Sequence, residues 1–282
     1  MGIDEKKISY IEERAQRIRI DIVEMAYRAG PERKAHPGPA LSAADIVAAL
    51  YFEILHIDPQ QPDWSDRDRF ILSKGHAAPV LYAALANRGY FDRSEYASLR
   101  CVNGMLQGHP DMRKTPGVDM TAGSLGHGLA AGLGMALSAR IDRKTFRTFV
   151  LLGDGECQEG LVWEAAMPSA AFGLNHLTAI VDANEWQSCG RVDCTVAIEP
   201  LADKWRAFGW NAVEIDGHDV ADILHAFESV VAVIDRPTVI IAHTVKGKGV
   251  SFMENDNSWH QKAPDRQQYL LALEELGGDR VV

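Results

Sequence analysis

The sequence lacks the segments that would export a protein or place it in a membrane. Its first seven residues carry no apolar stretch of the kind found in a signal peptide, and no apolar run approaches the ~20 residues that cross a bilayer. No internal repeat, low-complexity tract or Ser/Gly-rich linker divides the chain. We therefore expect a cytoplasmic protein without a membrane partner.

Cysteine and net positive charge are also scarce. Four cysteines among 282 residues are too few for a disulfide scaffold. Cys189 and Cys194 lie close together in the sequence, but no further pair of metal ligands accompanies them, so we expect free thiols.

The net charge of −10 argues against general nucleic-acid binding. It does not exclude an anionic ligand, because histidines, lysines and backbone N–H groups can concentrate positive potential locally.

The chain does contain a regular alternation of apolar runs and helical patterns. Hydrophobic residues make up 46% of the sequence, which allows a large core in one domain or two smaller ones. Strands are predicted at 69–72, 148–152, 177–181, 212–215 and 237–242, and helices at 8–29, 42–52, 125–140, 161–172, 200–208 and 220–234. Strands that alternate with helices predict an α/β fold, a parallel β-sheet with helices on both faces. The helix at 125–140 is rich in small residues and should pack very closely on its neighbour.

One stretch carries a chemical signature. Gly153-Asp154-Gly155 follows the strand at 148–152, and Asn184 follows the strand at 177–181, with a helix between them. In a parallel sheet these strand ends lie on one edge, where ligands bind. A carboxylate and an amide oxygen suit Mg²⁺, which commonly binds with a phosphate, and glycines and a helix N-terminus accommodate that phosphate. A Gly-Asp-Gly turn alone is also common before a helix, and it is Asn184 at this spacing that favours a ligand site.

The pairing resembles the thiamine diphosphate motif, in which Gly-Asp-Gly is followed, after a helix and a strand, by asparagine. Five further segments are similar to the N-terminal half of transketolases: Ser73-Lys74-Gly75-His76-Ala77, Gly108-His109-Pro110, residues 122–128, residues 205–210 and residues 244–249. The resemblance extends from about Ile18 to Pro264, nearly the whole chain. It implies the thiamine diphosphate-binding fold, of which this chain would form the diphosphate-binding domain.

The resemblance also has consequences for domain organisation. It implies a single domain over residues 1–282, without the pyrimidine-binding and C-terminal domains of full-length transketolases. We therefore expect one subunit of a split transketolase, paired with a separate C-terminal subunit in an α2β2 heterotetramer. That partner would supply the glutamate which transketolases place against the aminopyrimidine ring of the cofactor. The substrates would be sugars or sugar phosphates.

The cofactors implied by the resemblance are thiamine diphosphate and Mg²⁺. Asp154, Asn184 and the backbone carbonyl of Trp186 would hold the metal. The residues that would contact thiamine diphosphate are His76, Gly123, Ser124, Leu125, Asp154, Gly155, Glu156, Asn184, Lys246 and His260. Without the resemblance, Lys246 is more simply interpreted as a solvated loop charge, and 123–125 as ordinary packing at the start of a helix.

Four of the ten histidines match substrate-facing positions of the family: His36, His76, His109 and His260. Imidazole titrates near neutrality and exchanges hydrogen bonds with sugar hydroxyls, which suits proton transfer. Each alone is as readily a hydrogen-bonded loop histidine, and their joint match is what favours a catalytic cluster. The other histidines receive no catalytic role: His127, interpreted as structural, and His56, His176, His218, His225 and His243.

Glu159 completes the implied catalytic set. In transketolases the acid at this position belongs to a network that links two active sites. Its position also makes it an acid at a helix N-terminus, where the helix dipole favours negative charge. The two interpretations are compatible, and both stay open.

Three departures from the family pattern bear on substrate choice. Ala35 replaces a glycine before His36, Glu185 replaces a common second asparagine, and Gln261 replaces a glycine. The last two lie near the cofactor and the mouth of the family site, so we expect acceptor choice to differ from that of the pentose-phosphate enzyme. The sequence itself does not specify the donor or the acceptor.

The predicted activity is transfer of a two-carbon ketol unit from a ketose to an aldose. Two other interpretations stay open. The first is the α subunit of a thiamine-dependent 2-oxo-acid dehydrogenase, against which the histidine motifs argue. The second is a cofactor-binding relic without catalysis, against which the retention of Asp154, Asn184 and the four histidines argues.

Overall fold

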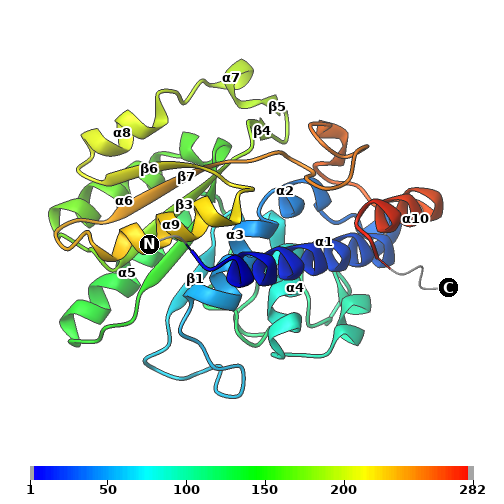
Figure 1. Cartoon of the computed structure of the whole chain (residues 1–282), viewed down its shortest axis with the longest axis horizontal. Coiled ribbons are helices and arrows are strands. Elements are labelled where there is room, and N and C mark those ends of the chain that lie inside the picture. The colour runs from blue at the N-terminus through cyan, green and yellow to red at the C-terminus, as the bar shows by residue number, and fades with distance from the viewer. Residues whose placement is uncertain (1–2, 279–282) are drawn as a thin grey trace.

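A five-stranded parallel sheet forms the centre of the molecule, in the order β1-β2-β3-β7-β6 (Figure 1). The computed structural model describes residues 3–278; residues 1–2 and 279–282, the ends of the predicted 1–282 domain, lie outside it. The strands of the sheet are β1 (Arg69–Leu72), β2 (Thr148–Gly153), β3 (Leu177–Ala183), β6 (Asn211–Asp216) and β7 (Thr238–His243). Strands β4 (Trp186–Gln187) and β5 (Gly190–Arg191) form a separate antiparallel hairpin. All five predicted strands and the α/β class are confirmed.

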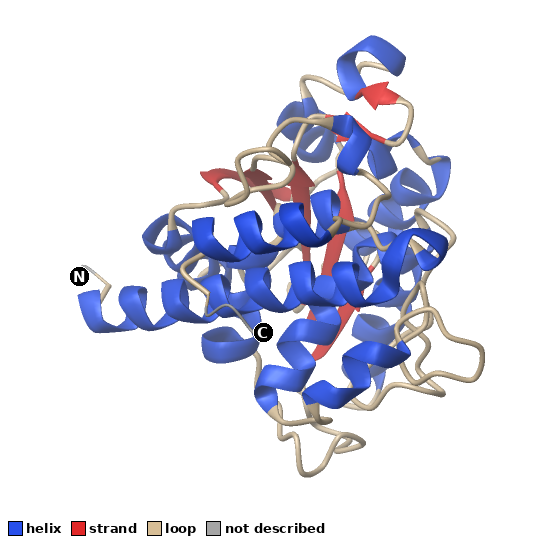
Figure 2. Ribbon diagram, turned by 90° about the vertical axis from the view of Figure 1, so that its right-hand side faces the viewer, coloured by secondary structure: helices blue, strands red, loops and turns tan. Residues whose placement is uncertain are grey.

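Helices enclose the strands (Figure 2). The longer ones are α1 (Glu5–Arg33), α4 (Ala78–Arg88), α5 (His127–Ile141), α6 (Gly160–Ala171), α9 (Val220–Val231) and α10 (Arg266–Glu275). The shorter ones are α2 (Pro37–Leu41), α3 (Ala44–Ala49), α7 (Val192–Thr195) and α8 (Leu201–Ala207). Single 3-10 or π turns are η1 (Leu50–Ile54), η2 (Gly75–Ala77), η3 (Arg93–Ser98), η4 (Gly155–Gln158) and η5 (Asn257–Trp259). The six predicted helices are present, with 42–52 divided into α3 and η1, whereas α4 and α10 have no predicted counterpart.

Successive residues of the central strands are buried on opposite faces, which creates two hydrophobic cores. Phe149 and Leu151 of β2 join the core under α1, α3, α4 and α9. Val150 and Leu152 join the core under α5, α6 and α8. Side chains alternate between the faces of a strand, so a sheet covered on both sides requires the continuous apolar runs seen in the sequence. Each such side chain stabilises the folded state by about 1.5–3 kcal/mol when fully buried. Because both faces are packed, the two cores hold the strand ends in place.

The small residues of α5 bring this helix directly against the sheet. A Cβ atom at Gly132 would lie 2.6 Å from Val150 Cγ2, and one at Gly128 would collide with Ser73, just beyond β1. The close packing predicted for 125–140 is thereby confirmed. It places the start of α5 at the C-terminal edge of the sheet.

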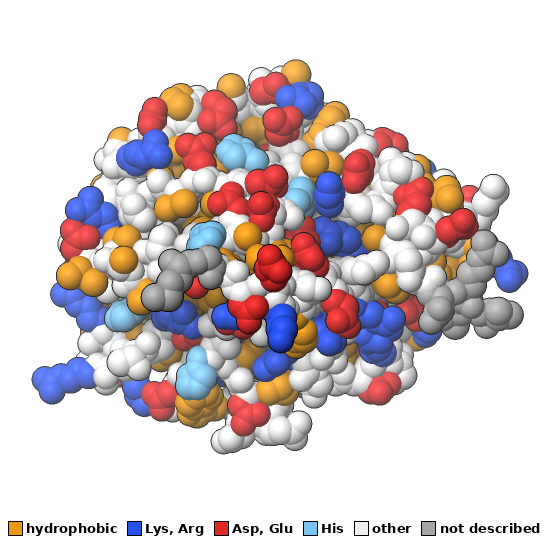
Figure 3. Space-filling view, viewed as in Figure 1, with side chains coloured by type: hydrophobic (Ala, Val, Ile, Leu, Met, Phe, Trp, Pro, Cys, Tyr) orange, Lys and Arg blue, Asp and Glu red, His pale blue; other side chains and the backbone are white. Residues whose placement is uncertain are grey.

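All four cysteines are free, as predicted, with Cys157 buried and Cys189 and Cys194 exposed. Within residues 3–278, no helix has both the length and the apolar character needed to cross a membrane. On the face shown in Figure 3, acidic and basic side chains are interspersed, with hydrophobic side chains between them.

Candidate active site

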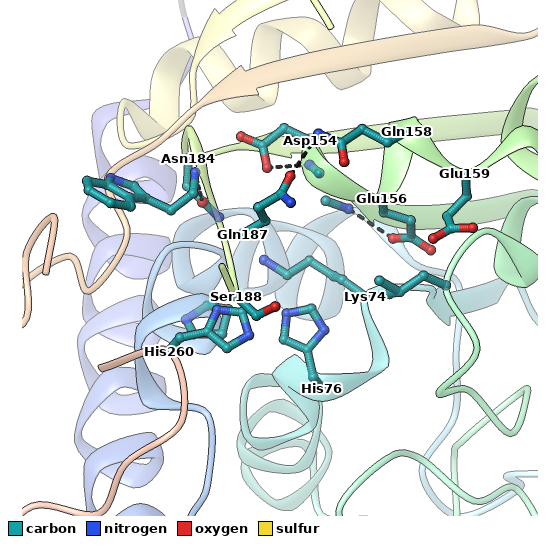
Figure 4. Close-up of a pocket in the computed structure, with 15 residues that line it drawn as sticks. Lys74, His76, Asp154, Glu156, Gln158, Glu159, Asn184, Gln187, Ser188 and His260 are labelled. Carbon is teal, nitrogen blue, oxygen red and sulfur yellow. Dashed lines mark hydrogen bonds between the residues drawn. The ribbon is translucent and has the colours of Figure 1, made fainter. Parts of the chain in front are cut away.

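A cavity of about 200 Å³ lies at the C-terminal edge of the sheet, between the ends of β1, β2 and β3 and the hairpin β4–β5 (Figure 4). Ligands of parallel α/β sheets bind at this edge. The predicted site residues that line it are His76, Leu125, Asp154, Gly155, Glu156, Glu159, Asn184, Trp186 and His260. The structure therefore brings most of the predicted set into one cavity, from segments far apart in the sequence.

Asp154, at the end of β2, has a buried carboxylate beside the cavity. Oδ1 accepts the N–H of Gly155 at 2.7 Å, and Oδ2 accepts the N–H of Glu185 at 2.5 Å. Burial, together with the negative charge of Asp182, raises the pKa of Asp154 to about 7. The ionised carboxylate is short of compensating positive charge, and a cation at this point would stabilise it.

Asn184, at the end of β3, is held in a single orientation by its neighbours. Its Nδ2 donates to Asp182 Oδ2 at 3.1 Å, and its Oδ1 accepts the N–H of Trp186 at 3.1 Å. A carboxylate accepts and does not donate, so Asp182 fixes which end of the amide is which. An amide oxygen has a second lone pair, and that of Asn184 remains available to a ligand.

Asp182 is fully buried and joins four segments around the cavity. Besides Asn184, its carboxylate accepts hydrogen bonds from Ser42 at 2.6 Å, from Lys74 and from Thr244. Burial opposes its ionisation, but Lys74 and these hydrogen bonds hold the pKa of Asp182 below its ordinary value. Neither Asp182 nor Lys74 is a predicted site residue. Their position at the ends of predicted strands, on the ligand-binding edge, is the signal that would find them.

Lys246 lies behind His260, which lines the cavity, and is fully buried, unlike a solvated loop charge. Its Nζ donates to Asn257 Oδ1 at 2.5 Å and lies 3.0 Å from His260 Nδ1. Burial, followed by the charge of Lys74, lowers the pKa of Lys246 to about 8. Its hydrogen-bond partners are neutral groups, so a nearby anion would stabilise the ammonium.

Three of the predicted histidines form a triangle next to Lys246. The ring centroids of His36 and His76 are 5.5 Å apart, those of His36 and His260 are 5.6 Å apart, and those of His76 and His260 are 5.2 Å apart. Burial, reinforced by nearby positive charge, lowers the pKa of His36 to about 4 and that of His260 to about 3. The pKa of His76 is lowered for the same reasons. All three rings are therefore neutral at pH 7, and each can both donate and accept a hydrogen bond.

The fourth histidine lies against the glycine loop that precedes α5. A Cβ atom at Gly123 would lie 3.4 Å from the ring of His109. Partial burial and the charge of Arg100 lower the pKa of His109. Arg100 also lowers the pKa of His36, so this unpredicted cation acts on both histidines. Ser124 in the same loop is exposed, and its predicted contact with a cofactor stays a prediction.

The two glutamates after β2 have different surroundings. Glu156 is buried, and its carboxylate accepts hydrogen bonds from Ser73 Oγ, from Gly126 N–H at 2.8 Å and from Gly153 N–H at 3.0 Å. These bonds tie η4 to the start of α5, and the predicted contact of Glu156 with a cofactor stays a prediction. Glu159 is exposed at the N-cap of α6 without a side-chain cap hydrogen bond. Its role in a network between sites also stays a prediction.

The two sides of the cavity fit a magnesium diphosphate. Asp154, Asn184 and Trp186 line one space, and a carboxylate, an amide oxygen and a backbone carbonyl are ligand types that suit Mg²⁺. Residues 3–278 hold no group of three or more His, Cys, Asp or Glu arranged for a metal, so a cation here depends on this mixed donor set. At Gly155 a Cβ would lie 3.0 Å from Gln187 Cβ, where hairpin and turn close on each other. The sheet and this cavity define an α/β protein with a candidate ligand site at its strand ends.

Comparison with known proteins identifies the family. Residues 11–279 match the family model "Transketolase, thiamine diphosphate binding domain". One subunit of the apulose-4-phosphate transketolase of Phocaeicola vulgatus is 38% identical, over 96% of this chain and 95% of that protein. The 6-deoxy-6-sulfo-D-fructose transketolase subunit SqwG of Clostridium sp. (strain MSTE9) is 44% identical, over 86% of this chain and 88% of that protein.

A solved structure gives the same answer for the fold. Transketolase of Pichia stipitis in complex with sedoheptulose-7-phosphate superposes with a TM-score of 0.91 at 27% identity, over 96% of this chain and 41% of that one. The chain thus spans nearly the full length of the two bacterial relatives but well under half of this transketolase. The chain belongs to the transketolase family of transferases. It corresponds to the thiamine diphosphate-binding domain of that family. The family resemblance and the fold predicted from the sequence are confirmed.

Proposed function

We propose that this chain is the thiamine diphosphate-binding subunit of a two-chain transketolase that transfers a two-carbon ketol unit from a ketose to an aldose. The observation that carries the proposal is the two-sided cavity. Asp154 and Asn184 line it from the strand ends, His76 and His260 also line it, and the buried Lys246 contacts His260 from behind the lining. The histidines and the relatives together favour this activity over that of a 2-oxo-acid dehydrogenase.

Different residues of the site would bind different parts of the cofactor. Asp154, Asn184 and the carbonyl of Trp186 would hold Mg²⁺, while Lys246 and the backbone at Gly155 would hold the diphosphate. When bound, thiamine diphosphate supplies the electron sink for cleavage of the C–C bond beside a ketose carbonyl. The protein supplies binding, orientation and control of protons around that chemistry.

The histidines would handle the sugar. His36, His76 and His260 are neutral at pH 7 because their pKa values are lowered, so each can donate a hydrogen bond to a sugar hydroxyl or accept one from it. His109, beside the glycine loop, would serve the same substrate from another side. Their burial also limits the water that reaches a reacting carbonyl.

A partner chain completes the proposed enzyme. It would carry the pyrimidine-binding domain and the glutamate that acts on the aminopyrimidine ring. Stable interfaces of this kind bury upwards of about 1,200 Å², and an α2β2 heterotetramer is the expected closed assembly. The single domain over 1–282, the cytoplasmic location and the network role of Glu159 stay predictions that accompany this proposal.

The substrates of the two relatives narrow the choice of donor. One relative is named for a ketose phosphate and the other for a ketose that carries a sulfonate. We therefore include ketoses with either anionic group among the donors to be tested. Glu185 and Gln261 are the positions at which acceptor choice is expected to depart from the pentose-phosphate enzyme.

The test is a transfer assay with the chain alone and with its partner, in the presence of Mg²⁺ and thiamine diphosphate. The paired chains should transfer the ketol unit from ketose to aldose, and the lone chain should be inactive because the pyrimidine half of the cofactor site is expected on the partner. Robust turnover by the lone chain would contradict the two-chain proposal. Turnover of 2-oxo acids in place of ketoses would favour the dehydrogenase, and binding without turnover would favour the relic.

A further inference from the structure

The loop that carries Lys246 is held from several directions by groups outside it. This loop, residues 244–249, follows β7. The N–H of Val245 donates to His218 Nε2 at 2.8 Å, and the N–H of Gly247 donates to the carbonyl of Gly38 at 3.1 Å. The carbonyl of Lys248 accepts from Arg19 Nε at 3.2 Å. The backbone on both sides of Lys246 is therefore fixed by neighbouring segments.

His218 is itself held by a buried carboxylate. Its Nδ1 lies 2.7 Å from Asp45 Oδ2. Because Nε2 accepts the Val245 N–H, the hydrogen of the neutral ring is on Nδ1 and is donated to Asp45. Asp45 is also bound by both ends of the Arg19 guanidinium, at 2.9 Å and 2.5 Å. The side chains of His218, Asp45 and Arg19 are only 12%, 8% and 10% exposed.

Arg19 therefore reaches the same loop twice. It donates directly to the carbonyl of Lys248, and it acts on Val245 through Asp45 and His218. Burial opposes the ionisation of Asp45, but Arg19 and the hydrogen bond from His218 hold its pKa below the ordinary value. Hydrogen bonds to an ionised group are stronger than neutral ones, so the ring of His218 is tightly oriented.

The turn that contains His218 does not depend on its ring. The backbone N–H of His218 donates to Asp216 Oδ1 at 2.8 Å, and Asp219 caps α9 by accepting from Ala221 and Asp222. The imidazole adds no hydrogen bond to this turn or to the helix. Its two ring nitrogens serve Asp45 and the Lys246 loop.

We propose that His218 is a positioning residue for thiamine diphosphate, which sets the Lys246 loop by accepting the Val245 N–H while Asp45 and Arg19 orient its ring. This inference rests on the proposed function, because it assigns Lys246 to the diphosphate. It gives a role to a histidine that the sequence leaves without one. His218 acts through Lys246 and does not itself line the cavity.

Two substitutions test the roles of the two ring nitrogens of His218 separately. His218→Asn places an amide near the position of Nδ1, so it can still donate to Asp45 but cannot reach Val245. His218→Gln is longer and can place its amide oxygen near the position of Nε2, where it can accept the Val245 N–H. His243→Gln is the matched control, because His243 lies next to the same loop but its exposed ring pairs with Glu214, at 3.3 Å, and not with the loop.

Three measurements are made on each protein: hydrogen exchange of the 244–249 amides in the unliganded chain, thermal unfolding, and calorimetric binding of thiamine diphosphate with Mg²⁺ by the paired chains. His218→Asn should exchange the Val245 amide about tenfold faster and bind the cofactor about tenfold more weakly, as expected for loss of one buried hydrogen bond. His218→Gln and His243→Gln should stay near wild type. Rescue by Gln but not by Asn is a pattern that a merely structural role would not produce.

The contradicting outcomes are distinct. Wild-type exchange and affinity in folded His218→Asn would overturn the positioning role alone. Equal losses in the Asn and Gln variants, in proportion to lost thermal stability, would also overturn it. If the Asn variant does not fold, a folded Gln variant decides: slow exchange at Val245 supports the role and fast exchange contradicts it. No binding by the wild-type pair would overturn the proposed function and, with it, the positioning role.

Discussion

The two sides of the cavity each contain a buried group whose charged form is disfavoured, and the two charges have opposite sign. On the side formed by the ends of β2 and β3, burial raises the pKa of Asp154 to about 7. On the side lined by His76 and His260, Lys246 lies behind the lining, and burial lowers the pKa of Lys246 to about 8. Each side disfavours its own charge, and each would be relieved by a ligand of opposite sign. A magnesium diphosphate, the ligand proposed for this site, would bring both signs at once and relieve both charges.

The two sides also differ in how they are held. Asp154 is bound by backbone N–H groups of its own turn and of the residue after Asn184. Lys246 is bound by side chains, and its loop is held by a network that reaches back to Arg19 in α1. The acidic side is therefore set by the sheet itself, whereas the basic side depends on tertiary contacts between distant helices.

Among changes on the basic side, the strongest loss of activity is expected for the histidines. His109→Ala and His260→Ala should each lower turnover of the paired enzyme by about 10²–10⁴-fold, because a positioned proton donor or acceptor is lost. Cofactor affinity should fall more in His260→Ala, since His260 Nδ1 lies 3.0 Å from Lys246 Nζ. Steady-state transfer and calorimetry measure the two effects. His225→Ala, in an exposed ring, is the control, and full activity of both variants would remove these histidines from the mechanism.

A smaller change is expected when the charge of Lys246 is removed. Lys246→Met should weaken thiamine diphosphate binding and at the same time raise the melting temperature of the unliganded chain, because a buried ammonium with a lowered pKa is removed. A gain of about 1 kcal/mol would appear as roughly 2–4 °C in a domain of this size. Lys248→Met, in the same loop, should change neither quantity. A lower melting temperature for Lys246→Met would show that the ammonium stabilises the unliganded fold and that the two sides are not alike.

How much of the fold could be predicted from the sequence depends on how local each feature is. The strands were predictable because burial on both faces requires unbroken apolar runs such as that of β2. Helix α4 was not, because Ala78 to Leu85 are all buried and leave no amphipathic period to detect. The hairpin β4–β5 is too short for any periodic pattern.

The site residues likewise fall into those that a local motif predicts and those that only long-range contacts bring together. Asp154 and Asn184 sit in a motif within one strand–helix–strand unit, so their spacing was informative. The Asp182–Lys74 pair joins strand ends more than a hundred residues apart, and no spacing rule indicates it. His218 received no role from the sequence, because its partner Asp45 is 173 residues away. Contacts of this length follow from the fold and not from any local pattern.

The mildest change is expected in the pH dependence of stability. The pKa values of His36 and His260 in the folded chain are about 4 and about 3, below the ordinary value of 6.5. Between those values the unfolded chain binds protons that the folded chain does not, so stability is complete above pH 6.5 and is lost as the pH falls toward 4. A double variant, His36→Asn with His260→Asn, should lose less stability over this range than wild type. Denaturant unfolding at pH 7 and pH 5 measures the difference, and identical pH slopes would contradict the neutral histidine cluster.

In the proposed function, the acidic side of the cavity binds Mg²⁺, and the diphosphate binds partly through that ion. The decisive experiment is a calorimetric titration of thiamine diphosphate into the paired chains, with and without Mg²⁺, in which wild type is compared with Asp154→Ala. The exposed carboxylate of Asp142, replaced by Ala, is the matched control. We predict that wild type and Asp142→Ala bind the cofactor only with Mg²⁺, and that Asp154→Ala, although folded, does not bind it. Unchanged affinity in Asp154→Ala would contradict the assignment of this cavity.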